Sequence, residues 1–188
     1  MAHRAGVYLG TMLTLIALGW LIAAAPAARA QDASPPADTA ETADAETRGP
    51  VTNLPLPRFV SLKAGTANIR RGPSTTHRID WVFTRAGMPL EVLGEYEHWR
   101  RVRDHDGFGG WIHFTLLTGA RSGLVTTDLA PLYARPDTGA PMNAQLEANV
   151  IVALDKCARD WCRGKVGGAR GWLRKADIWG VGADETFD

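Results

Sequence analysis

Apolar and polar residues alternate over short stretches of this chain, and each stretch ends within a few positions. Leu90, Val92 and Tyr96 follow one another at mostly even spacing with polar residues between them, which is the period of a half-buried strand. Residues 99–103 alternate in the same way, and residues 108–114 supply a closing strand. No window sustains a 3.6-residue apolar period. The pattern therefore predicts an all-β fold with helix limited to single turns.

Turn-forming residues separate the expected strands. Gly72-Pro73-Ser74 interrupts the extended segment 67–70, and Gly87-Met88-Pro89 precedes the central strand. Residues 104–107 end in Asp-Gly, a pair typical of the β-hairpin turn. Turns recur every 8 to 12 residues, a spacing that indicates many short strands in a small barrel or folded sheet.

The landmarks of the first unit recur about sixty residues later. Three of them keep their order: Pro73 and Pro136 are 63 residues apart, Trp99 and Trp161 are 62 apart, and Gly110 and Gly171 are 61 apart. The offset shrinks by one residue across each hairpin, as small deletions in turns would give. We therefore expect a duplication, with one barrel at residues 58–119 and a second at residues 122–180.

The first thirty residues have the layout of a secretory signal peptide. His3 and Arg4 form a positive start, residues 7–25 are mostly apolar, and Ala28-Arg29-Ala30 is a small-x-small site. We expect cleavage near Ala30 and a periplasmic or secreted mature chain with no membrane association. The apolar run approaches spanning length, so an uncleaved membrane anchor is the alternative.

Residues 31–57 have the composition of a disordered acidic tether. Acidic residues are scattered there among Ala, Thr and Pro, with hardly a large apolar side chain before Val51. Such a segment buries too little surface to offset its ordering entropy. Residues 181–188 remain as a C-terminal tail. Without residues 1–30 the chain has 19 basic and 20 acidic residues, and this balance argues against nucleic acid as a partner.

Several motifs of the first unit resemble the bacterial SH3-like (SH3b) domain from end to end. These motifs are Asn68-Ile69-Arg70-Arg71-Gly72-Pro73-Ser74, Gly87, Leu90-Glu91-Val92-Leu93-Gly94, Trp99-Arg100-Arg101-Val102 and Gly109-Gly110-Trp111-Ile112. The second unit is similar, except that Pro131-Leu132-Tyr133-Ala134-Arg135-Pro136 replaces the first motif. The pair resembles the tandem SH3-like periplasmic proteins of Gram-negative bacteria.

The resemblance implies two tandem SH3-like barrels that act as a non-catalytic binding module of the cell envelope. Its expected partner is peptidoglycan or a wall-associated protein. Two alternatives stay open: a periplasmic protein–protein adaptor, and a regulatory partner of a wall hydrolase encoded elsewhere. An enzyme in its own right is not expected, and no cofactor is expected.

Cys157 and Cys162 flank the turn of a hairpin in the second unit. An even pair at this spacing, in a chain expected to enter an oxidising compartment, predicts a structural disulfide. A redox-active pair is the alternative, but the two-residue spacing of thioredoxin-like sites is absent.

Neither a catalytic nor a metal site is expected from the remaining side chains. The first unit contains His77, His98, His105 and His113, but they belong to separate turns and strands, and a metal site needs three or four converging ligands. No serine lies in a Gly-x-Ser-x-Gly elbow.

Tryptophans are the candidate binding residues. They can stabilise a small core, or they can stack on sugars and extended peptides. Trp99 and Trp161 follow hairpin turns and are expected to be more exposed than Trp111 and Trp172. In the first unit, four further residues are expected to complete a ligand groove: Arg70, Trp81, Tyr96 and Glu97.

Overall fold

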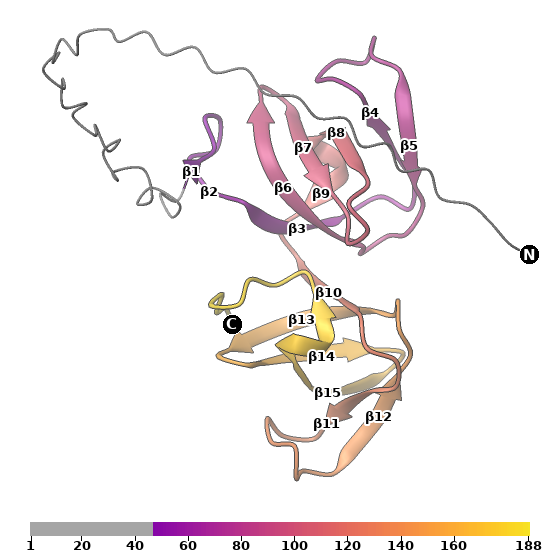
Figure 1. Ribbon diagram of the computed structural model, residues 1–188, viewed down its shortest axis with the longest axis vertical. Coiled ribbons are helices and arrows are strands. Elements are labelled where there is room, and N and C mark those ends of the chain that lie inside the picture. The colour runs from indigo at the N-terminus through magenta and orange to yellow at the C-terminus, as the bar shows by residue number, and fades with distance from the viewer. Residues whose placement is uncertain (1–46) are drawn as a thin grey trace, which may run out of the picture. The chain divides into compact units, whose positions relative to one another are not determined.

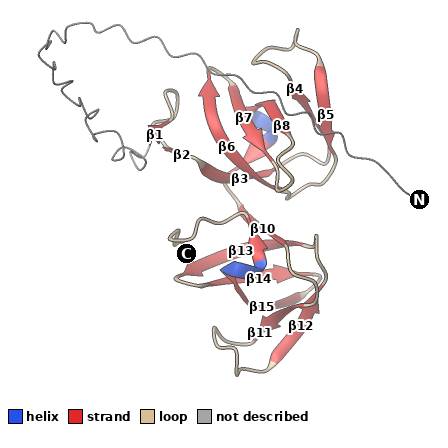
Figure 2. Cartoon of the chain, viewed as in Figure 1, coloured by secondary structure: helices blue, strands red, loops and turns tan. Residues whose placement is uncertain are grey.

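The structure is a computed structural model that describes residues 47–188. The expected signal peptide at residues 1–30 and residues 31–46 of the expected tether lie outside the described residues. The described residues belong to one compact unit, built of strands and two 3₁₀ turns (Figure 2). The all-β prediction is confirmed.

The first barrel is a seven-stranded antiparallel sheet in the order β5-β4-β8-β7-β6-β3-β9 (Figure 1). Its elements are β3 (Arg58–Leu62), β4 (Ala67–Arg70), β5 (Ile79–Phe83), β6 (Pro89–Tyr96), β7 (Trp99–Arg103), β8 (Gly109–His113), η1 (Phe114–Leu116) and β9 (Leu117–Thr118). Because β8 lies between β4 and β7, a strand from early in the barrel sequence, β4, pairs with one from late in it, β8.

The second barrel repeats this order as β12-β11-β15-β14-β13-β10-β16. Its elements are β10 (Arg121–Val125), β11 (Ala130–Tyr133), β12 (Met142–Leu146), β13 (Ile151–Ala158), β14 (Trp161–Val166), β15 (Ala169–Arg174), η2 (Lys175–Asp177) and β16 (Ile178–Trp179). Both sheets also carry a register shift at the same place in the central hairpin. The duplication read from the sequence is therefore confirmed in the topology.

Each barrel has its own aliphatic core. Ile69, Leu90, Val92 and Ile112 are fully buried in the first barrel. Leu132, Val152 and Leu173 are the counterparts of Ile69, Leu90 and Ile112 in the second. These side chains occupy every second position of their strands, as the alternation predicts. Burial of each contributes about 2 kcal/mol.

The tryptophans are not core residues, contrary to one of the two expectations for them. Trp99, Trp111, Trp161 and Trp172 are all half-buried, and neither core cluster contains a tryptophan. Trp111 and Trp172 each precede a fully buried residue on their strand, so their side chains point to the other face of the sheet.

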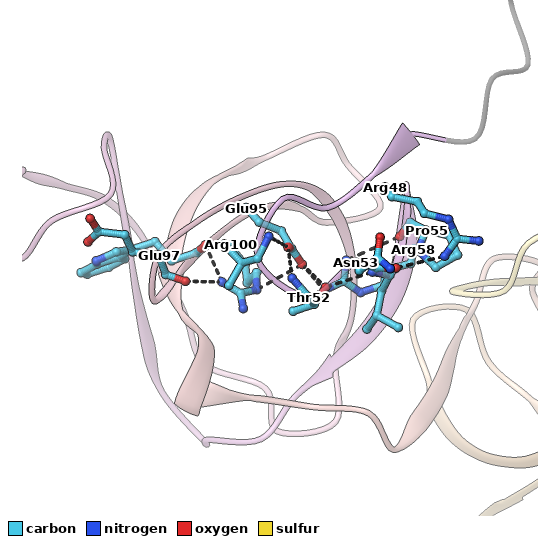
Figure 3. Close-up of polar contacts among 11 residues, drawn as sticks. Arg48, Thr52, Asn53, Pro55, Arg58, Glu95, Glu97 and Arg100 are labelled. Atoms are coloured by element: carbon cyan, nitrogen blue, oxygen red, sulfur yellow. Dashed lines mark hydrogen bonds and ion pairs between the residues drawn. The ribbon is translucent and has the colours of Figure 1, made fainter.

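The prediction of a disordered tether through residue 57 is wrong for residues 47–57. Strands β1 (Thr47–Arg48) and β2 (Pro55–Leu56) pair as a small antiparallel hairpin. Leu56 is only 8% exposed and joins the core of the first barrel. The turn of the hairpin also binds Glu95 on β6 through Thr52 (Figure 3). These contacts lie far apart in the sequence, so composition alone does not show them.

The C-terminal tail packs on the second barrel. The backbone of Phe187 exchanges two hydrogen bonds with Cys157, at 2.7 and 3.0 Å. The guanidinium of Arg121 lies over the Phe187 ring, 4.9 Å from its centroid, and also pairs with Glu185. Both terminal segments of the described chain are thus attached to the barrel that they adjoin.

A short connection joins the barrels, and strand β10 contacts both β3 and β6. The hydroxyl oxygens of Ser61 and Ser122 are 2.6 Å apart and buried. Phe59 meets Trp179 edge to face, with 5.1 Å between ring centroids. Contact between the barrels follows the expectation from the shortness of the connecting segment.

Candidate functional site

A groove of about 260 Å³ opens on the first barrel beside Trp99. Neighbouring segments of β4, β7 and β8 supply its walls because these strands are adjacent in the sheet. Asn68 and Arg70 project from β4, while His113 projects from the end of β8. The groove thus combines one half-buried indole with polar side chains that donate and accept hydrogen bonds.

Arg70 fixes one wall of this Trp99 groove. Its Nη1 atom donates to the backbone oxygens of Thr75, at 2.9 Å, and His77, at 2.6 Å. Arg70 therefore holds the loop between β4 and β5 at the edge of the groove, and Thr75 is among the lining residues. These bonds go to neutral carbonyls, so the positive charge of Arg70 keeps its capacity to attract an anion.

The indole of Trp99 is held by His113. The two rings meet edge to face with centroids 5.5 Å apart and an interplanar angle of 88°. The Nδ1 atom of His113 lies 2.8 Å from the hydroxyl oxygen of Thr115. This arrangement fixes the Trp99 ring without burying it, which suits stacking on a ligand.

The structure brings together two of the candidate residues from the sequence and separates the others. Arg70 and Trp99 both line the groove. Trp81 instead packs at a tilt against Phe108, with ring centroids 4.5 Å apart and an interplanar angle of 47°, at the edge strand β5. Tyr96 is 52% exposed near the hairpin turn, outside the lining of the groove. Glu97 occupies that turn with a φ of 45°, and its backbone oxygen accepts a hydrogen bond from Arg100.

Asn68, Thr75 and His113 are groove residues that the sequence reasoning did not select. Asn68 opens the motif that carries the family resemblance and alternates with buried Ile69, so the strand period contained a sign of its exposure. No comparable sign existed for His113, which lies 45 positions away from Asn68 along the chain.

Trp161 occupies the position of Trp99 in the second barrel, but its surroundings differ. Tyr133 takes the place of Arg70 and packs edge to face on Trp161, with centroids 5.6 Å apart. A cavity of about 340 Å³ beside Trp161 is lined partly by Ala183 of the C-terminal tail. Lys175 holds that tail through its Nζ atom, 2.8 Å from the backbone oxygen of Ala183. The grooves of the two barrels are therefore not equivalent.

A cluster of charged residues surrounds Glu95, whose side chain is fully buried (Figure 3). Burial of the carboxylate raises its pKa, but hydrogen bonds from Thr52, Arg58 and Val51 outweigh burial and lower the pKa to about 2. Arg100 lies 3.5 Å away on the paired strand. Because the protein itself satisfies this carboxylate, the cluster joins the N-terminal hairpin to the barrel and leaves no group for a ligand.

The two cysteines form a disulfide across the β13–β14 hairpin, as the sequence predicts. Among residues 47–188, no three His, Cys, Asp or Glu side chains converge as a metal site would require. Within the same span, no helix is long and apolar enough to cross a membrane.

Both barrels match one family model, described as the bacterial SH3 domain, at residues 63–119 and 126–180. The chain belongs to the bacterial SH3 domain family. This protein carries two such domains in tandem. No curated protein sequence matches the chain.

Solved structures similar to this SH3 protein include two from Trichomonas vaginalis and one from Bacillus cereus. NlpC2 of T. vaginalis is 17% identical over 65% of this chain, with a TM-score of 0.30 and 48% of its own chain covered. NlpC1 of T. vaginalis is 16% identical over 65% of this chain, with a TM-score of 0.29 and 45% covered. An NlpC/P60 family protein of B. cereus ATCC 10987 is 15% identical over 64% of this chain, with a TM-score of 0.30 and 55% covered. This chain thus spans about half the length of each.

Proposed function

We propose that this protein is a non-catalytic, peptidoglycan-binding module of the cell envelope and that the Trp99 groove of the first barrel receives the ligand. The observation that carries the proposal is the half-buried Trp99 indole, which His113 fixes edge to face on the wall of a groove. Membership of a family of cell-wall-binding modules supports the substrate class.

The chemistry of the groove suits this polymer. An indole face stacks on the apolar face of a sugar ring or on an extended peptide. Asn68 and Thr75 provide donors and acceptors for hydroxyl and amide groups. Arg70 adds a positive charge that suits the carboxylates of stem peptides.

The proposed location is the periplasm or the exterior of the cell, after cleavage of a signal peptide near Ala30. The disulfide between Cys157 and Cys162 supports this location because such bonds persist in oxidising compartments.

A sacculus pull-down tests the proposal. Protein from Gln31 onward is incubated with purified peptidoglycan, and Trp99→Ala is compared with Trp161→Ala. We expect saturable retention that falls about tenfold in Trp99→Ala, from loss of roughly 1–3 kcal/mol of stacking. Trp161→Ala should bind like the wild type because Tyr133 and the tail surround that indole. Circular dichroism checks that both variants are folded. Absence of retention, or equal loss in both variants, would contradict the proposal.

A protein–protein adaptor is the second candidate, and the edge strand β5 favours it. Ile79, Trp81 and Val82 are 44%, 44% and 51% exposed on a strand that ends its sheet and has one edge unpaired by any strand of residues 47–188. An extended segment of a partner can add to such an edge through backbone hydrogen bonds. Crosslinking in the periplasm, with Val82→Lys as the variant, tests this candidate; a crosslinked partner lost in that variant would support it.

Regulation of a wall hydrolase encoded elsewhere is a third hypothesis. It is tested by adding the protein to a hydrolase assay and measuring the rate.

A further inference from the structure

A second groove of about 470 Å³ lies on the first barrel, and three arginines line it. Arg71 follows β4, while Arg101 and Arg103 project from β7. Leu93 and Trp111 supply apolar surface beside them. We call this the arginine groove; Trp99 and Arg70 are not among its lining residues.

The three arginines differ in their partners. Arg71 pairs with Asp80, at 3.2 Å, and Arg103 pairs with Glu91, at 2.5 Å. The side chain of Arg101 is exposed and forms no hydrogen bond and no ion pair with any residue in the described span 47–188. The groove therefore contains a guanidinium that no group of residues 47–188 neutralises.

The second barrel has an arginine at the position equivalent to Arg101, and that arginine has a partner. Arg101 faces Trp111 across the β7–β8 pair, and Arg163 faces Trp172 across the equivalent β14–β15 pair. Arg163 is therefore the counterpart of Arg101. Unlike Arg101, it is neutralised: its Nε atom lies 2.7 Å from a carboxylate oxygen of Asp155.

Two substitutions between the barrels explain why the arginine groove is open. Leu93 takes the position of Asp155, because both occupy the register shift of the central hairpin. Gly109 takes the position of Arg170, whose guanidinium pairs with the other oxygen of Asp155. The second barrel thus closes this position with a carboxylate between two arginines, whereas the first barrel retains an arginine and lacks both other side chains.

We propose that the arginine groove binds a peptide carboxylate, which takes the place beside Arg101 that Asp155 takes beside Arg163. The planar guanidinium of Arg101 presents paired N–H donors that match the two oxygens of a carboxylate. Leu93, 38% exposed, and Trp111 contact the aliphatic part of the same ligand residue. Gly109 also lines the groove, and a Cβ atom there would lie only 2.0 Å from the backbone oxygen of Val102.

The ligand group is a carboxylate rather than a phosphate for two reasons. The group found between the arginines of the second barrel is itself a carboxylate. In addition, Asp80 lines the groove and Glu91 pairs with one of its arginines, so a dianion meets more repulsion than a monoanion does.

The test is an NMR titration with small probes. N-acetyl-alanyl-alanine is compared with its C-terminal amide and with methyl phosphate, while the indole N–H signal of Trp111 is followed. We expect a saturable shift with the free acid, little shift with the amide, and weakening by added salt. Arg101→Gln should reduce affinity for the acid about fivefold or more.

Leu93→Asp is the more decisive variant. It places a carboxylate beside Arg101, at the position where the second barrel carries Asp155. It should abolish the shift while the protein stays folded. Arg163→Gln is the matched control in the second barrel and should bind the acid like the wild type. Equal binding of acid and amide, unchanged binding in both first-barrel variants, or preference for methyl phosphate would overturn the proposal. None of these outcomes depends on sacculus binding.

Discussion

Glu95 on β6 and Cys157 on β13 occupy the same position in the two barrels. Glu95 faces Arg100 across the central hairpin of the first barrel, and Cys157 faces Cys162 across that of the second. Both positions also hold a terminal segment, because Glu95 binds the turn at Thr52 and Cys157 binds the backbone of Phe187. One position in a duplicated fold is thus closed by a buried ion pair in one copy and by a covalent bond in the other.

Replacing Glu95 should change both the stability of the protein and its dependence on pH. The pKa of Glu95 is about 2 in the folded state, against 4.5 for an unperturbed glutamate carboxyl. A lowered folded-state pKa contributes stability that is present above pH 4.5 and is lost as the pH falls towards 2. Glu95→Gln removes the negative charge beside Arg58 and Arg100, so we expect it to cost about 3 kcal/mol at pH 7.

Urea unfolding of wild type and Glu95→Gln at pH 7, 4 and 3 measures this effect. The wild type should lose stability over this range faster than the variant, so the difference between them should shrink as the pH falls. Asp155 and Asp80 also have lowered pKa values, chiefly through hydrogen bonds from Arg163 and Arg78 respectively, and they act in both proteins alike. A constant difference between the two proteins from pH 7 to 3 would contradict the prediction.

Removing the disulfide should destabilise the second barrel. Cys157 and Cys162 close a loop of five residue steps, for which chain entropy gives about 2 kcal/mol. The double variant Cys157→Ala/Cys162→Ala should have a free energy of unfolding lower by that amount, as measured by urea denaturation. Mass analysis without reductant should find wild-type protein lighter than reduced protein by two hydrogen atoms. Two free thiols in protein isolated from the periplasm would contradict the assignment.

The N-terminal hairpin should behave as part of the first barrel. Leu56 is 8% exposed within the core, so Leu56→Ala is expected to cost about 2 kcal/mol. Leu54, in the same hairpin, is 48% exposed and provides the matched control, because Leu54→Ala should cost less than about 0.5 kcal/mol. Urea unfolding measures both values. Equal effects of the two substitutions would show that the hairpin does not dock in solution.

The strand pattern was predictable from sequence because a half-buried sheet imposes a period of two on the chain. Ile69, Val92 and Val102 fall on that period and are buried. The same period also indicates the outward direction of Trp111, which precedes buried Ile112, although composition suggested that tryptophans form the core. The alternation along a strand is thus a better guide to burial than the size of a side chain.

The terminal segments and the site were less predictable because their contacts join distant parts of the chain. Thr52 and Glu95 are 43 positions apart, and no local pattern around residue 52 indicates that its backbone N–H donates to a distant carboxylate. Arg70 and Trp99 were both selected from sequence. Their shared groove, however, depends on β8 lying between β4 and β7. Asn68 and His113 join them only through this strand order.

The C-terminal tail provides the last prediction. Phe187 is half-buried under the guanidinium of Arg121, and its backbone oxygen accepts the Cys157 N–H at 2.7 Å. Phe187→Ala removes the apolar contact that holds the tail, so we expect a loss of about 2 kcal/mol in the second barrel. The Cys157 amide should then exchange with solvent faster, because its partner oxygen belongs to the released segment.

Hydrogen exchange followed by NMR measures this release directly, and exposed Thr186 offers the control variant Thr186→Ala. We expect normal protection of Cys157 in the control and reduced protection in Phe187→Ala, with amides of β14 and β15 unaffected. Release of the tail should also remove Ala183 from the cavity beside Trp161. If Cys157 remains protected at the wild-type level, the backbone pairing holds the tail without the ring of Phe187. The side chain would then be incidental to the attachment.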